Sequence, residues 1–87
     1  MHELSIALEI SRLAEERLGR GGLQDLVTVG LEVGNDSGVE AHNLQFCLEA
    51  LLAPPFRARP LMQLVEGDAL RITFLEVDDE HSDDRAA

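Results

Sequence analysis

A chain of 87 residues with a single cysteine has to hold its fold with one small hydrophobic core. Cys47 has no second cysteine in this sequence with which to form an internal disulfide. A lone thiol is typical of a reducing compartment, no stretch reads as a signal peptide, and no apolar run is long enough to cross a membrane. We therefore expect a single cytoplasmic domain over residues 1–77, without membrane association.

Charge limits the kind of partner. The formal net charge of −10 argues against nucleic acid and anionic lipid, and suits cations or basic protein surfaces better. The sequence also shows no nucleophile–base set and no phosphate loop. Gly19 to Gly22 is a helix stop, because it follows no strand and contains no lysine. We predict that the chain is not an enzyme.

Apolar periodicity predicts two helices in the first two thirds of the chain. Residues 3–20 carry a wide apolar stripe opposite Glu9, Arg12, Glu15 and Glu16, and end at a run of glycines. A second helix begins near Glu40, which closes a Ser-x-x-Glu capping box with Ser37, and stops at Pro54-Pro55. Cys47 lies on its apolar face and His42 on its surface.

Three strands complete the pattern. Alternating apolar residues predict one over 25–34, and further strands over 61–65 and 70–77 joined through Gly67-Asp68 as a hairpin. The order helix, strand, helix, strand, strand predicts an α+β fold, with two helices on one face of a three-stranded sheet. Residues 78–87, which include His81, are acidic and read as a disordered tail.

The first three residues carry the most distinctive chemistry. The α-amine of Met1, with a reference pKa of about 8, precedes the imidazole of His2, and the backbone nitrogens of His2 and Glu3 lie close by. Such nitrogen donors suit Ni(II) or Cu(II) in a tetragonal arrangement. The alternative is an ordinary histidine near a flexible terminus, with Glu3 favouring the first helical turn through the helix dipole.

Four segments resemble one known family. Residues 1–6 (MHELSI), 27–34 (VTVGLEVG), 39–47 and 67–78 are similar to stretches of the HypA/HybF proteins, the accessory factors for nickel insertion into [NiFe] hydrogenase and, in some bacteria, urease. The resemblance implies the family's nickel-binding fold and Ni(II) as a transient cargo. It also implies the hydrogenase large subunit and a maturation GTPase as partners.

The resemblance assigns a metal site residue by residue. The family's nickel donors correspond here to the Met1 amine, His2 and the backbone around Glu3, and an acidic residue reported near the site corresponds to Glu40. The alternative role for Glu40 is that of the capping-box residue, and one residue can serve both.

The sequence departs from the family in its middle. Family members carry a zinc module with two Cys-x-x-Cys pairs, whereas this sequence has one cysteine and a short linker at residues 54–60. We therefore expect no zinc, and Cys47 as a small core residue. Two functions remain open: a minimal nickel metallochaperone, or a non-metal interaction, assembly or scaffold protein of a hydrogenase system. The small core also favours homo-oligomers.

Overall fold

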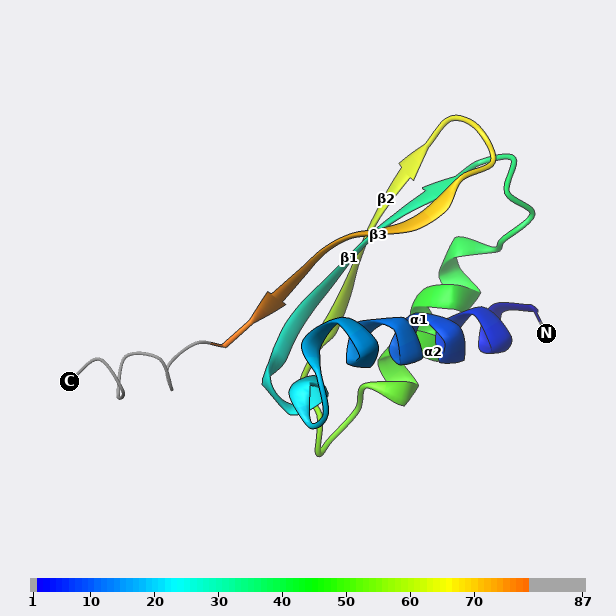
Figure 1. Ribbon diagram of the computed structural model, residues 1–87. Coiled ribbons are helices and arrows are strands. Elements are labelled where there is room, and N and C mark those ends of the chain that lie inside the picture. The colour runs from blue at the N-terminus through cyan, green and yellow to red at the C-terminus, as the bar shows by residue number, and fades with distance from the viewer. Residues whose placement is uncertain (1, 79–87) are drawn as a thin grey trace.

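The computed structural model describes residues 2–78. Within them the elements are α1 (His2–Leu18), the 3-10 helix η1 (Gly22–Asp25), β1 (Leu26–Gly34), α2 (Ala41–Leu51), β2 (Arg59–Val65) and β3 (Leu70–Val77). Both helices lie on the same face of the three-stranded sheet (Figure 1). The predicted α+β class and element order are therefore confirmed. No helix within residues 2–78 is long and apolar enough to cross a membrane.

Helix α1 ends where a glycine permits a left-handed backbone. Gly19 has a φ of 87°, and its N–H donates to the carbonyl of Glu15 at 2.8 Å. The helix is therefore two residues shorter at this end than predicted. Its buried residues are Ala7, Ile10 and Ala14, two of which are small enough to let the helix backbone lie close to its neighbours.

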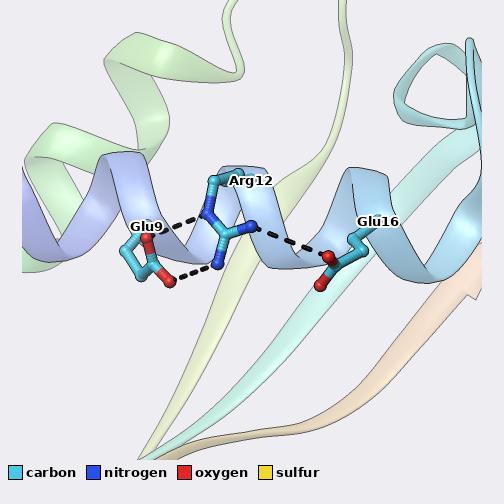
Figure 2. Close-up of polar contacts among 3 residues, drawn as sticks. All are labelled: Glu9, Arg12 and Glu16. Atoms are coloured by element: carbon cyan, nitrogen blue, oxygen red, sulfur yellow. Dashed lines mark hydrogen bonds and ion pairs between the residues drawn. The ribbon is translucent and has the colours of Figure 1, made fainter.

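A network of ion pairs lies on the solvent side of α1 (Figure 2). Arg12 donates from Nε and Nη2 to the two carboxylate oxygens of Glu9 at 3.1 and 2.7 Å, and its Nη1 lies 3.7 Å from Oε2 of Glu16. The bond from Arg12 lowers the pKa of Glu9, and the same contact raises the pKa of Arg12. This polar face keeps α1 oriented with its apolar stripe towards the sheet.

Strand β1 is the centre of the sheet. It pairs in parallel with β2 on one side and antiparallel with β3 on the other. The predicted hairpin between the last two strands is therefore wrong, because β1 lies between them. Its side chains explain this position: Leu26, Val29, Leu31 and Val33 are buried, whereas β2 and β3 have no fully buried residue. The strand with the most buried side chains thus takes the central position, with a neighbour on each side.

The segment between β2 and β3 crosses the end of β1 instead of turning back on itself. Asn35 donates its backbone N–H to Val65, and Gly34 donates to the carbonyl of Ala69. A side chain at Gly34 would collide with the backbone of Gly67. Gly67-Asp68 therefore does not form a hairpin between β2 and β3, and the backbone of this loop bonds to the end of β1 instead.

The core lies between the sheet and the two helices. Leu44 and Leu48 of α2 are fully buried against the apolar face of β1, and Cys47 is half-buried against the same cluster. Asp78 is not part of a disordered tail as predicted, because its N–H donates to the carbonyl of Asp25 at 2.8 Å. The rest of the predicted tail, including His81, lies outside the described residues.

Candidate metal site at the start of helix α1

His2 is the first residue of α1, and its side chain is exposed. The first backbone N–H groups of a helix have no acceptor within the helix. A metal ion that replaces the amide proton of His2 or Glu3 therefore breaks none of the helix's own hydrogen bonds. Met1, the other predicted donor, lies outside the described residues.

Glu3 ties the start of α1 to the start of α2. Its Oε2 accepts the backbone N–H of Glu40 at 3.0 Å, across 37 positions of sequence. This bond, followed by one from its own backbone N–H, lowers the pKa of Glu3. The charged carboxylate therefore anchors the first turn of α1, a contact that the helix-dipole interpretation of Glu3 did not include.

Glu40 is the N-cap residue of α2. Its Oε1 accepts the N–H of Asn43 at 3.0 Å, and its side chain is exposed. The predicted capping box is wrong, because the Ser37 hydroxyl accepts the N–H of Val39 and donates to the carbonyl of Gly34. Ser37 closes the turn after β1, too early to cap a helix that begins at Ala41. Glu40 still caps the helix, from the N-cap position itself.

His2 borders a surface hollow between α1 and the turn before α2. The other residues that line it are Ser5, Ile6, Ser37, Gly38 and Val39. Sequence patterns do not indicate that these five residues share a hollow, because only the packing of α1 against the β1–α2 turn brings them together. Of the predicted site residues, the structure places His2 at this hollow and joins Glu3 to Glu40 beside it.

Side chains alone do not assemble a metal centre in the described part of the chain. Residues 2–78 contain no group of three or more His, Cys, Asp and Glu side chains close enough to share an ion. His42 is exposed on α2 and borders a different hollow, with Met62 and Leu64 of β2. Any tetragonal site at His2 has to draw on backbone nitrogens, which are donors for Ni(II) and Cu(II) once deprotonated.

Fold and site together define a two-layer α+β domain whose candidate metal donors gather where its first helix begins. The sequence profile described as hydrogenase/urease nickel incorporation metallochaperone, HypA, matches residues 1–60. The chain belongs to this HypA family. Its members are metallochaperones rather than enzymes, as the sequence predicted.

Three relatives, each named hydrogenase maturation factor HypA, show the extent of the likeness. The protein of Parabacteroides distasonis is 37% identical over 70 residues, which are 78% of this chain and 61% of the relative. That of Azotobacter chroococcum is 35% identical over 66 residues, 76% and 58% of the two chains. That of Polaromonas naphthalenivorans is 43% identical over 51 residues, 59% and 44% of the two chains.

The family profile matches only part of the chain, and the chain matches only part of its relatives. The chain spans between 44% and 61% of the length of these relatives. The family profile covers α1, β1, α2 and the first two residues of β2. The resemblance of residues 67–78 to the family's final strand lies beyond that match and stays a prediction.

Proposed function

We propose that this chain binds Ni(II) at the start of α1 and carries it, as a metallochaperone, towards the maturation of [NiFe] hydrogenase. The observation that supports this most is the position of His2. His2 is exposed at the start of a helix, where the first backbone N–H groups have no acceptor within the helix. The carboxylate of the neighbouring Glu3 accepts the backbone N–H of Glu40. Membership of the HypA family gives the site its expected cargo.

The proposed donors are the Met1 amine, the His2 imidazole and the backbone nitrogens of His2 and Glu3. Four nitrogen donors in one plane favour Ni(II) over Zn(II), which prefers a tetrahedral set. Glu40 contributes negative charge near the ion and keeps the start of α2 next to it. This sequence lacks the Cys-x-x-Cys pairs that usually bind a structural zinc ion. We therefore expect nickel as the cargo and no bound zinc.

The proposed setting is the cytoplasm, where the single thiol of Cys47 stays reduced. Partners of this function are the hydrogenase large subunit, which would receive the ion, and a maturation GTPase. The relatives' names link them to hydrogenase maturation, and we extend that role to this chain. An acidic chain with a net charge of −10 suits a basic docking surface on either partner.

Isothermal titration of the untagged protein with Ni(II) tests the proposal. We expect His2→Ala to weaken binding by more than about tenfold, because the imidazole and the geometry around it are lost. The matched control is His42→Ala, an exposed histidine on α2 that borders another hollow. Equal affinity in the wild type and His2→Ala would refute the proposal, as would a loss confined to His42→Ala.

A second function is favoured by the middle of the sequence. A short linker joins α2 to β2, and the single cysteine leaves no Cys-x-x-Cys pair. A domain of this kind can keep the fold as a non-metal assembly or scaffold subunit of a hydrogenase system. Unchanged nickel affinity in His2→Ala, together with a stable complex with a hydrogenase subunit in the absence of nickel, would favour this second function.

A further inference from the structure

The sheet has one face that the helices leave open (Figure 1). Residues Thr28, Gly30 and Glu32 of β1 alternate with the buried Val29 and Leu31, so they point to this open face. The strand register groups the residues of the face in three rows across the sheet. The first polar row is Arg59, Thr28 and Glu76, the apolar row is Leu61, Gly30 and Phe74, and the second polar row is Gln63, Glu32 and Arg71.

The apolar row has a glycine at its centre and an exposed apolar side chain on each side of it. A side chain at Gly30 would collide with the ring of Phe74, so the ring lies over β1. Leu61 is 59% exposed and Phe74 is 44% exposed, although both stand on a sheet. Removing such exposed apolar side chains from water against another surface is favourable.

The two polar rows carry opposite charges at their β3 ends. Glu76 stands at the end of the first row, where it accepts from the hydroxyl of Thr28 at 2.8 Å. Arg71 stands at the end of the second row, where its Nε donates to Glu32 at 2.9 Å. One carboxylate and one guanidinium thus flank the apolar row on the same edge strand.

This pattern is complementary to itself. A two-fold axis that runs along the apolar row exchanges the two polar rows. It lays Glu76 of one copy on Arg71 of the other, and Thr28 on Glu32, while Phe74 meets Phe74 and Leu61 meets Leu61. No two residues that stand directly opposite each other carry like charges, and Arg71 lies next to Glu32 where Glu76 of the other copy approaches. Two sheets stacked in this way keep their strand directions aligned, which is a common sheet-on-sheet packing.

We propose that the open face of the sheet binds the same face of a second copy of this chain, about a two-fold axis along the Leu61–Gly30–Phe74 row. Three strands about 4.8 Å apart make a narrow face, well below the roughly 800 Å² per partner of a standard interface. The dimer is therefore weak and reversible, with a dissociation constant in the micromolar range or above, on the order of 10 to 1000 µM.

Sedimentation equilibrium of the complete chain tests the proposal. The runs span about 10 µM to about 1 mM protein, with a reductant for Cys47 and about 0.15 M salt to screen the repulsion between two acidic chains. The average mass is expected to rise from 9.6 kDa towards twice that value. A mass that stays at that of one chain throughout this range would overturn the proposal.

Two sets of variants locate the interface. Leu61→Glu places like charges on the axis and is expected to weaken association at least about tenfold. The control Phe46→Ser removes a 71% exposed ring from the outer side of α2 and is expected to have no effect. A dimer lost in Phe46→Ser but kept in Leu61→Glu would place the second copy on α2 and contradict us. Circular dichroism checks that each variant is folded.

Reversing the charges of Glu76 and Arg71 tests the direction of the two-fold axis. Glu76→Arg alone sets Arg against Arg71 of the second copy, and is expected to weaken the dimer about tenfold or more. Adding Arg71→Glu in the same chain restores opposite charges across the interface, so most of the lost affinity should return. Equal weakness in the single and double variants would rule out the proposed axis.

Discussion

At the scale of single residues, Glu3 holds the start of α1 in place. Its charge and position predict a favourable interaction with the helix dipole. In the fold, its carboxylate instead accepts the backbone N–H of Glu40 and so joins the two helices at their starts. Nothing in the spacing of the two residues indicates this contact, because it depends on how α1 packs beside the β1–α2 turn.

Glu9 provides a pH-dependent test of the exposed network on α1. The bond from Arg12 lowers the pKa of Glu9 below its ordinary value of 4.5. A lowered pKa in the folded state adds stability above pH 4.5, and this stability is lost as pH falls through the folded value. We therefore expect Glu9→Gln to reduce the melting temperature slightly at pH 7 and not at all near pH 2.

The matched control for Glu9 is Glu15→Gln, the same change on the same helix outside the Glu9–Arg12–Glu16 network. Glu15→Gln is expected to leave the difference in melting temperature between pH 7 and pH 2 the same as in the wild type. Exposed ion pairs contribute little, so differential scanning calorimetry with replicate scans is the suitable measurement. A deficit of Glu9→Gln that persisted at the acidic pH would show that Arg12 is not its cause.

At the scale of elements, the start of α2 combines two functions in one residue. Glu40 caps the helix through Asn43, and its backbone N–H holds Glu3. Its side-chain charge and its capping bond can be separated, because asparagine is as good an N-cap as aspartate but has no charge. Glu40→Asn is therefore expected to keep the free energy of unfolding within about 0.5 kcal/mol of the wild type, while it weakens Ni(II) binding a few-fold.

Glu40→Ala is the comparison that removes the cap, with an expected loss of about 1 kcal/mol in the free energy of unfolding. Urea denaturation measures this term, and titration calorimetry measures nickel affinity on the same samples. If Glu40→Asn binds Ni(II) as tightly as the wild type, Glu40 acts only as a cap. Its assignment to the metal site would then be withdrawn.

In the sheet, sequence patterns predict which face of a strand is buried but not which strands lie beside it. Alternation in β1 predicted a strand with one buried face, and Val29, Leu31 and Val33 are buried as expected. The same method paired β2 with β3, because Gly67-Asp68 between two apolar runs is a hairpin signal. The structure instead places β1 between β2 and β3. The buried side chains of β1 favour this central position over a β2–β3 hairpin.

At the scale of the whole molecule, the α+β class and the order of elements followed from periodicity alone. The strand order, the cap at Glu40 and the hollow beside His2 did not, because each depends on contacts between segments far apart in sequence. The family resemblance predicts nickel donors at His2 and Glu3. The fold places the start of α2 beside them, because Glu3 accepts the backbone N–H of Glu40.

The central claim is that Ni(II) binds through the N-terminal amine together with His2. The most direct measurement is a Ni(II) titration of the untagged chain against a version with the sequence Gly-Ser-Gly-Ser added ahead of Met1. The extension keeps the imidazole, Glu3 and Glu40 but moves the free amine away from them. The account predicts that affinity falls by more than about tenfold and that the square-planar Ni(II) absorption is lost. Equal affinity and an unchanged spectrum in the two proteins would contradict it.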